Sequence, residues 1–414
     1  MKKIKLLFLV VFAVPSISYC QEIAKDNKAT LIHIVDSVLN SQVKAEKIPG
    51  AVIQIKQHGK IVYTNTYGFA QIYNDQHEKL ASPEKLTRYH QFDIASLTKV
   101  IGTTTSMMLL ADKGLIHVDD FVGKYIPAFN VGDKSKITIR HLLTHTSGIY
   151  EWYPMYYKSD NKQATFKLIA SLPLAYETGT KRKYSDLGFT ILGQIIEIVS
   201  KQSLDHFVMD NVFKPLGMVH SGYNPLTLKM NLPIAATSIG NPYEHRMVYD
   251  TTLGFQFKEI DPTAWNGWRN YTLKGEVNDG NTWYANKGVS GAAGIFSTID
   301  DLQLLVDMLL NEGKAGGKQF LSSKTIHHFI TKDAFNNGLG WMMDPINSFM
   351  KDAPEGSFGH TGFTGTSIAI VPNKNLSVIL LINRQQIGLL NGKEYYNVNP
   401  IRQQIITAAL QYVH

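Results

Sequence analysis

Hydrophobic and polar residues alternate along two stretches of the chain, one towards each end. The first stretch, IPGAVIQIKQHGKIVYTNTYGFA (48–70), contains two alternating segments joined at His58-Gly59, a pattern typical of a β-hairpin. The second, TSIAIVPNKNLSVILLIN (366–383), contains two apolar segments on either side of the turn at 372–375. We therefore expect one pair of strands from each end of the chain.

Helical patterns fill most of the remaining chain. Short helices are expected around Leu31–Val43 and in IRQQIITAALQYV (401–413), residues 100–215 are mainly helical, and residues 216–290 are loop-rich and aromatic. Strands from both ends with helices between them predict an α/β fold of the α+β type, with an antiparallel sheet flanked by helices and an inserted helical subdomain. A functional site is expected in the cleft between the two parts.

The first twenty residues have the pattern of an export signal. Three lysines at positions 2, 3 and 5 precede the apolar run Leu6–Val14 and the stretch PSISYC. Cleavage after Cys20 would release a soluble periplasmic or secreted protein, and we favour it over lipoprotein anchoring at Cys20 because Tyr19 stands where a small residue is usual. The apolar run is short for a bilayer and no second one follows, so no transmembrane helix is expected in the mature form.

The mature chain, residues 21–414, is expected to form one domain with two subdomains. The sheet subdomain would comprise residues 21–110 and 290–414, and the helical and loop subdomain residues 111–289. The whole chain has 414 residues, of which 44% are hydrophobic, which is enough for a sizeable core.

Charge and cysteine content exclude several classes of partner and site. Loss of residues 1–20 removes three of the 41 basic residues and none of the 34 acidic ones, so the net charge falls from +7 to +4. No basic stripe indicates a nucleic-acid partner. Cys20 is the single cysteine, which excludes an intramolecular disulfide, a cysteine metal cluster and a thiol nucleophile. The sequence indicates no oligomeric state.

A Ser-x-x-Lys pair stands at the start of a strongly apolar segment. The spacing itself is common, since it begins at five serines: Ser41, Ser82, Ser96, Ser159 and Ser348. Only Ser96 precedes a segment, Leu97–Lys113, that is apolar on nearly every side and so predicts a buried helix. Helix N–H groups near Ser96 favour negative charge, and burial would lower the pKa of Lys99, as a proton acceptor near neutral pH requires. A capping serine beside a snorkelling lysine is the purely structural alternative.

Two further motifs follow in the chain. Tyr-x-Asn/Asp occurs five times, but only Tyr184-Ser185-Asp186 directly precedes a periodic helix, LGFTILGQIIEIVSK (187–201), and Tyr284 is its main rival. His360-Thr361-Gly362 is the single His-Thr-Gly and comes just before the C-terminal strand pair.

The order Ser-x-x-Lys, Tyr-x-Asn and Lys/His-Thr-Gly resembles the serine β-lactamase and penicillin-binding protein superfamily, in particular class C β-lactamases, D-Ala-D-Ala carboxypeptidases and their esterase relatives. The stretches GLIHVDDFVGKYIPAF, ITIRHLLTHTSGI and GVSGAAGIFSTIDDL resemble the same group, and the similarity runs from about Ile48 to Arg384. It implies that Ser96 is the acylated nucleophile, that Lys99 activates it, and that Tyr184 is the general base for deacylation. It also implies an oxyanion hole formed by the N–H groups of Ser96 and Phe363.

Two positions depart from the usual motifs of true β-lactamases. Asp186 replaces an asparagine, and its carboxylate near Lys99 would favour the ammonium form of the lysine. His360 replaces a lysine, and since histidine titrates near neutrality, its attraction for a substrate carboxylate would weaken as the pH rises. The resemblance implies that Asp186, His360, Thr361, Gly362 and Phe363 contact the substrate.

The function expected from these motifs is an exported serine hydrolase that forms a covalent acyl-enzyme, acting on peptidoglycan-derived peptides as a carboxypeptidase or amidase. A carboxylesterase, a class C-like β-lactamase and a non-catalytic binding module are the alternatives. No metal or organic cofactor is implied: His141 and His145 have a zinc-like spacing but lack the adjoining catalytic glutamate. A Ser-His-Asp hydrolase is disfavoured because GVSGA (288–292) lacks the final glycine of Gly-x-Ser-x-Gly. WYPMYYKSD (152–160) is either a substrate-lining loop or a packing excursion.

Overall fold

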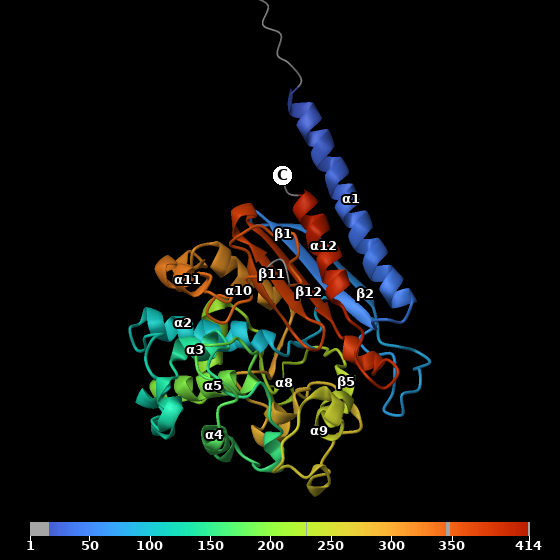
Figure 1. Cartoon of the computed structure of the whole chain (residues 1–414). Helices are drawn as coiled ribbons and strands as arrows, with labels where there is room; N and C mark the ends of the chain where they lie inside the picture. Colours follow the sequence, from blue (N-terminus) through green and yellow to red (C-terminus); the bar gives the residue numbers. More distant parts are fainter. Residues whose placement is uncertain (1–15, 229, 345–347, 413–414) are drawn as a thin grey trace, which may run out of the picture.

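A five-stranded antiparallel sheet combines strands from the two ends of the chain (Figure 1). The computed structural model describes residues 16–228, 230–344 and 348–412, and of residues 16–26 the backbone alone. The strand order in the sheet is β10-β11-β12-β1-β2. The strands are β1 (Gly50–Gln57), β2 (Lys60–Gly68), β10 (Phe358–Thr361), β11 (Ser367–Val371) and β12 (Leu376–Ile382).

Both expected strand pairs are confirmed, with their turns at the expected residues. His58 and Gly59 join β1 to β2 with φ angles of 47° and 73°, which is the left-handed backbone that a two-residue hairpin turn requires. The two pairs meet where β1 lies antiparallel to β12, with Ile53 opposite Leu380. The pairing of β1 with β12 therefore joins the two strand pairs into one sheet.

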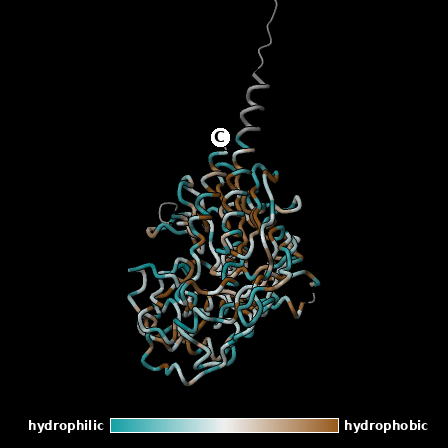
Figure 2. The backbone as a smooth tube through the Cα atoms, turned by 90° about the vertical axis from the view of Figure 1, so that its right-hand side faces the viewer, coloured by the Kyte–Doolittle hydropathy of each residue, from teal (hydrophilic) through white to brown (hydrophobic). Residues whose placement is uncertain are grey.

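Alternate residues of the central strands face opposite sides of the sheet. Ile53 and Leu380 pack beneath α1 (Ser16–Lys44) and α12 (Asn399–Tyr412), which lie side by side on the outer face (Figure 1). Val52 and Ile379 point the other way, into a core shared with the helical part of the molecule. Hydrophobic segments, brown in Figure 2, run through the interior between these layers. A sheet covered on both faces explains why its central strands are apolar almost throughout.

The remaining elements lie beneath the inner face of the sheet. Among them are the helices η1 (Lys99–Thr104), α2 (Thr105–Asp112), α3 (Ile139–Leu143), α4 (Lys162–Ser171), α5 (Asp186–Ser200), α6 (Leu204–Val208), α8 (Pro225–Leu228), α9 (Pro242–Tyr249), η9 (Asn281–Ala285), α10 (Ile299–Leu310) and α11 (Ser323–Phe329). A small sheet of β3 (Phe92–Asp93), β7 (Ile295–Ser297) and β4 (Gly222–Tyr223) and the pairs β5 (Ser238–Ile239) with β6 (Thr272–Leu273) and β8 (Lys314–Ala315) with β9 (Lys318–Gln319) also belong to this set. The apolar segment from Leu97 is buried as expected, and its first turns, η1, have the wider π-helical form. One continuous core joins both parts of the molecule. The subdomain boundaries at residues 110 and 290 stay a prediction.

The segment predicted as an export signal lies mostly outside the described residues, which begin at Ser16. The helix expected around Leu31–Val43 is part of the longer α1. No helix among the described residues has the length and apolar character needed to cross a membrane.

Glycines allow α5 to approach the segment Gly288–Ala292. A Cβ atom on Gly291 would lie 2.1 Å from the carbonyl oxygen of Phe189 and 3.0 Å from the backbone nitrogen of Gly193. The carbonyl of Gly291 also accepts a hydrogen bond of 2.8 Å from the hydroxyl of Thr103 in η1. The close approach at Gly291 therefore ties together three segments of the helical part.

We predict that Gly291→Ala destabilises the fold by about 1–3 kcal/mol, because overpacking forces the backbone of α5 away. Gly188→Ala in α5 is the matched control, since the atoms nearest to its new Cβ lie at 3.5 Å or more, and its stability should stay the same or rise slightly. Thermal unfolding of both variants measures the difference. Equal melting temperatures for the two variants would contradict the packing argument.

Candidate active site

Ser96 lies at a sharp turn between β3 and η1. The residue before it, Ala95, has a φ angle of 46°, which is unfavourable for a residue with a side chain. The buried carboxylate of Asp93 holds this turn by accepting hydrogen bonds from the N–H groups of Ala95 at 2.8 Å and Asn278 at 2.6 Å. Burial raises the pKa of Asp93 to about 6. Asp93 thus connects the turn at Ser96 to the segment that begins at Asn278.

Lys99 is completely buried and has three hydrogen-bond acceptors around its ammonium group. Its Nζ atom lies 3.0 Å from Ser96 Oγ, 2.9 Å from the carbonyl oxygen of Ala292 and 2.6 Å from Asp186 Oδ1. Three acceptors match the three protons of a charged lysine. Lys99 therefore contacts both Ser96 and Asp186 directly.

The expected lowering of the Lys99 pKa is wrong. Burial does disfavour the charged form, but the adjoining carboxylate of Asp186 outweighs this effect and raises the pKa of Lys99 above its ordinary value. The sequence showed that both effects would act on this lysine, and the 2.6 Å contact decides between them. The contact with Asp186 therefore favours the ammonium form of Lys99.

Tyr184 lies beside Lys99 and Ser96, whereas Tyr284 belongs to another part of the molecule. The Lys99 Nζ atom lies 5.0 Å from the centre of the Tyr184 ring, and both Lys99 and Ser96 lie near enough to the Tyr184 hydroxyl to lower its pKa. Burial raises the pKa of Tyr184, and the charge of Lys99 partly offsets that rise. The hydroxyl of Tyr284 instead lies 3.0 Å from Asn241 Oδ1, and its ring packs on Trp265.

His145, which the sequence suggested only as half of a zinc-like pair, supports the Tyr184 segment. Its Nδ1 accepts a hydrogen bond of 3.0 Å from the N–H of Ser185, and its ring lies 4.4 Å from that of Tyr184. Burial lowers the pKa of His145 well below its ordinary value, so the ring is a neutral acceptor. His141 instead caps α3 through Thr138. No group of three potential metal-ligating side chains occurs among the described residues.

His360 is buried behind Tyr184 and does not line the pocket. Its ring centre lies 6.0 Å from that of Tyr184, and only 2% of the residue is exposed. Burial, together with the positive charge of Lys99, lowers the pKa of His360 to about 3. We expected His360 to titrate near neutrality and to attract a substrate carboxylate less strongly as the pH rises, and this expectation is therefore wrong. Its ring is neutral throughout the physiological range.

Thr361 ends β10, and Gly362 allows the following loop to approach Ser96. A Cβ atom on Gly362 would lie 2.1 Å from Thr366 Oγ1 and 2.5 Å from the carbonyl oxygen of Ile94. The carbonyl of Gly362 belongs to the same peptide unit as the N–H of Phe363, and Arg402 from α12 reaches that carbonyl at 3.5 Å. Within the described part of the chain, neither the N–H of Phe363 nor that of Ser96 donates a hydrogen bond. Both donors are available to a ligand.

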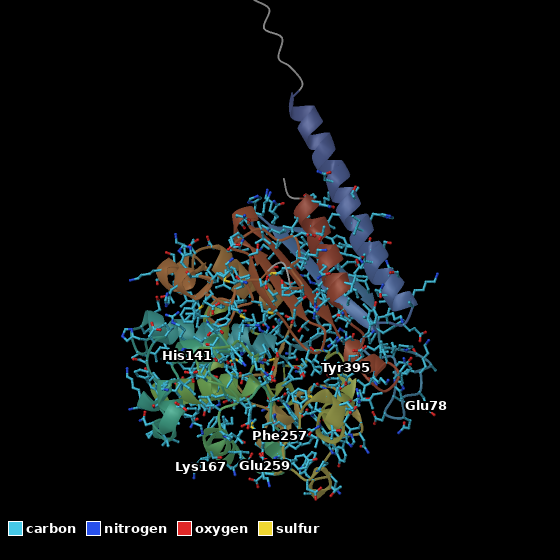
Figure 3. The ribbon with its side chains drawn as sticks, in the orientation of Figure 1. Glu78, His141, Lys167, Phe257, Glu259 and Tyr395 are labelled. Atoms are coloured by element: carbon cyan, nitrogen blue, oxygen red, sulfur yellow. The ribbon has the colours of Figure 1, made fainter. Side chains whose placement is uncertain are left out.

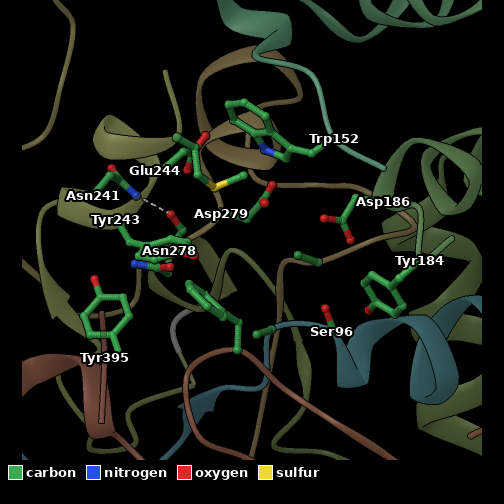
Figure 4. A pocket seen from close by; sticks show the side chains of 14 residues that line it. Ser96, Trp152, Tyr184, Asp186, Asn241, Tyr243, Glu244, Asn278, Asp279 and Tyr395 are labelled. Carbon is green, nitrogen blue, oxygen red and sulfur yellow. Dashed lines mark hydrogen bonds between the residues drawn. The ribbon is translucent and has the colours of Figure 1, made fainter. Parts of the chain in front are cut away.

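A pocket of about 220 Å³ opens beside Ser96 (Figure 4). Of the predicted site residues, Ser96, Tyr184, Asp186 and Phe363 line it, whereas Lys99, His360, Thr361 and Gly362 do not. The helix α9 contributes Tyr243, Glu244 and Met247 to the lining, and loops around the pocket contribute the others: Ala95, Trp152, Asn241, Asn278, Asp279, Ala293 and Tyr395.

The stretch 152–160 both lines the pocket and packs behind it, so neither of the two expectations for it excludes the other. Trp152 borders the pocket, while Tyr153 packs against Phe257 at 4.7 Å and Tyr156 against Trp265 at 4.6 Å. Figure 3 shows Phe257 low in the helical layer and Tyr395 nearer the sheet. Apart from the 152–160 stretch, no sequence pattern marks these residues, because they come from α9 and from several separate loops.

We predict that Asp186→Asn lowers the pKa of Lys99 by roughly 1–3 units, because an adjoining opposite charge is lost. The rate at which a fluorophosphonate probe labels Ser96, measured from pH 6 to 11, should then decline at lower pH than in the wild type. Asp160→Asn, which changes an exposed carboxylate outside the pocket, serves as the control. If the labelling rate of Asp186→Asn declines at the same alkaline pH as that of the wild type, Asp186 does not hold the proton on Lys99.

Known proteins resemble this chain over most of its length. The family model described as Beta-lactamase matches residues 35–398. An N-acetylmuramyl-L-alanine amidase of Bacillus subtilis is 32% identical over 88% of this chain and 83% of its own. A putative D-alanyl-D-alanine carboxypeptidase of Salmonella enteritidis is also 32% identical, over 94% of this chain and 91% of its own.

A family VIII carboxylesterase has the same fold, with a TM-score of 0.66 and 18% identity over 92% of this chain and 97% of its own. The fold expected from the sequence, that of β-lactamases and transpeptidases, is thereby confirmed. The chain belongs to the β-lactamase family of serine hydrolases.

Proposed function

We propose that this chain is an exported serine hydrolase that forms an acyl-enzyme at Ser96 and acts on peptidoglycan-derived peptides. The contact of 3.0 Å between Ser96 Oγ and the buried ammonium group of Lys99, at the edge of the pocket, carries the proposal. A capping serine and a snorkelling lysine would not account for it, because Lys99 is wholly buried beneath the pocket rather than extended to solvent.

In the proposed acylation, Ser96 Oγ attacks the carbonyl carbon of the substrate. Lys99 already carries three protons and cannot accept another, so the Ser96 proton goes to the oxygen of Tyr184 in its phenolate form, which is the minor form because burial raises the pKa of Tyr184. The ammonium charge of Lys99 stabilises the Tyr184 phenolate and the developing negative charge on Ser96. When the carbon–nitrogen bond breaks, the leaving amine takes the proton from Tyr184.

The N–H groups of Ser96 and Phe363 would donate hydrogen bonds to the oxyanion of the tetrahedral intermediate. Such donors act most strongly in the transition state, and the loss of one typically lowers kcat by about 10²–10³. For deacylation, Tyr184 would accept a proton from the attacking water and return it to Ser96 as the ester bond breaks.

The names of the relatives and the export signal support a peptidoglycan substrate. The two relatives at 32% identity are named N-acetylmuramyl-L-alanine amidase and putative D-alanyl-D-alanine carboxypeptidase. Both names refer to enzymes that cleave bonds of the cell wall. Residues 1–20 would carry the chain to the compartment where those bonds occur, with release after Cys20 rather than lipid anchoring. Carboxylester hydrolysis is the second candidate, supported by Trp152, Tyr243 and Phe363, whose aromatic rings suit a small acyl group.

We predict that a fluorophosphonate probe adds one covalent group to the wild-type protein and none to Ser96→Ala, with both proteins unfolding at nearly the same temperature. Intact-mass spectrometry followed by peptide mapping measures the adduct. An adduct on the Ser96→Ala variant would contradict the assignment of the nucleophile. Absence of an adduct on the folded wild type would favour the non-catalytic module.

Purified muropeptides test the substrate class. Mass spectrometry of the digest should show either loss of D-alanine or release of the stem peptide, and the Ser96→Ala protein is the control. Unchanged muropeptides together with rapid hydrolysis of p-nitrophenyl butyrate would favour the carboxylesterase, and rapid hydrolysis of nitrocefin would favour the β-lactamase.

A further inference from the structure

The pocket beside Ser96 has an unusual distribution of charge. Its lining contains three carboxylic acids, Asp186, Glu244 and Asp279, and, among the described residues, no lysine, arginine or histidine. Figure 4 shows Asp279 between the other two acids on the pocket wall above Ser96. Asp186 is neutralised by Lys99, but neither Glu244 nor Asp279 forms an ion pair within the described residues.

The positions of Glu244 and Asp279 are fixed by the backbone at the start of η9. Glu244 Oε2 accepts a hydrogen bond of 2.8 Å from the N–H of Gly280, and Asp279 Oδ1 accepts one of 2.7 Å from the N–H of Thr282. Burial, followed by the charge of Asp279, raises the pKa of Glu244 to about 8. Burial, followed by the charge of Asp186, raises the pKa of Asp279. These carboxylates repel one another, and a cation bound between them would relieve the repulsion.

Other pocket side chains are also unpartnered although more than nine-tenths buried. The side-chain oxygen of Asn278 accepts no hydrogen bond from the described residues, and the hydroxyl of Tyr395 and the indole N–H of Trp152 have no partner there either. None of these polar atoms is fully buried within the described residues, and all three residues line the pocket, so the atoms are free to bind a polar ligand there. Asn278 directly precedes Asp279 in the chain, and its side-chain oxygen can accept a hydrogen bond from a ligand N–H or O–H group.

We infer that this pocket binds an ammonium group of the substrate, with Asp279 as the main charged partner and Glu244 and the side-chain oxygen of Asn278 as further acceptors. The inference rests on the proposed function, since it names the substrates that would reach Ser96: acyl donors or peptides that carry a free amine. It also disfavours a substrate whose carboxylate must enter the same pocket. Among cell-wall peptides, those with a free amino group fit better than a terminal D-Ala-D-Ala that must place its carboxylate here.

The binding of n-butylammonium tests this inference, with uncharged n-butanol as the matched ligand. The Ser96→Ala protein is used, so that binding is measured without chemistry, and ligand-observed NMR gives the two dissociation constants. We expect n-butylammonium to bind roughly tenfold more tightly than n-butanol, as a charge-assisted hydrogen bond contributes. Asp279→Asn in the same background should abolish the preference, whereas Asp160→Asn should keep it.

Equal binding of the two ligands to the Ser96→Ala protein would overturn the inference, and so would a preference that survives in Asp279→Asn. If Asp279→Asn does not fold, as judged by thermal unfolding, Glu244→Gln takes its place, and an unchanged preference in that variant would equally overturn the inference. Fluorophosphonate labelling of the wild type tests the proposed function separately. If the Ser96→Ala protein prefers n-butylammonium but the wild type is not labelled, the ammonium site is supported and the proposed hydrolase function is contradicted.

Discussion

The ion pair between Lys99 and Asp186 is the interaction on which the arrangement of the site depends. A lysine with no exposed surface is stable only if its charge is compensated and its protons are all hydrogen-bonded. Asp186 at 2.6 Å provides the charge, and Ser96 and Ala292 complete the set of acceptors. Those acceptors come from three separate segments of the chain. The buried ammonium thus holds together the turn at Ser96, the start of α5 and the Gly288–Ala292 segment.

The same ion pair changes the chemistry open to the site. A buried lysine without a carboxylate neighbour would lose its proton readily and could serve as a base. With Asp186 in place, the charged form of Lys99 is favoured, and in the proposed mechanism the proton of Ser96 therefore goes to Tyr184. In this mechanism, the carboxylate of Asp186, in place of an amide, makes Tyr184 rather than Lys99 the proton acceptor.

The acidic pocket and the neutral His360 both bear on the charge of the substrate group that the site prefers. A lysine in the Lys-Thr-Gly motif would bring positive charge to the substrate, but the buried imidazole here is neutral and lies behind Tyr184. The acids Asp279 and Glu244 then dominate the pocket beside Ser96, and their raised pKa values mean that a further negative charge there is unfavourable. The electrostatics of the site favour a cationic substrate group over an anionic one.

Local patterns in the chain were sufficient to identify both strand pairs, the buried helix after Ser96 and the three motifs, because alternation, turn residues and motif order are properties of short segments. They also placed Ser96, Lys99, Tyr184 and Asp186 in one site through the family resemblance. The ionisation of Lys99 and His360 could not be obtained in this way, since it depends on distances and burial created by segments that are far apart in the chain. The same holds for Trp152, Glu244 and Asp279, which come from α9 and two different loops and become neighbours only when the chain folds around the pocket.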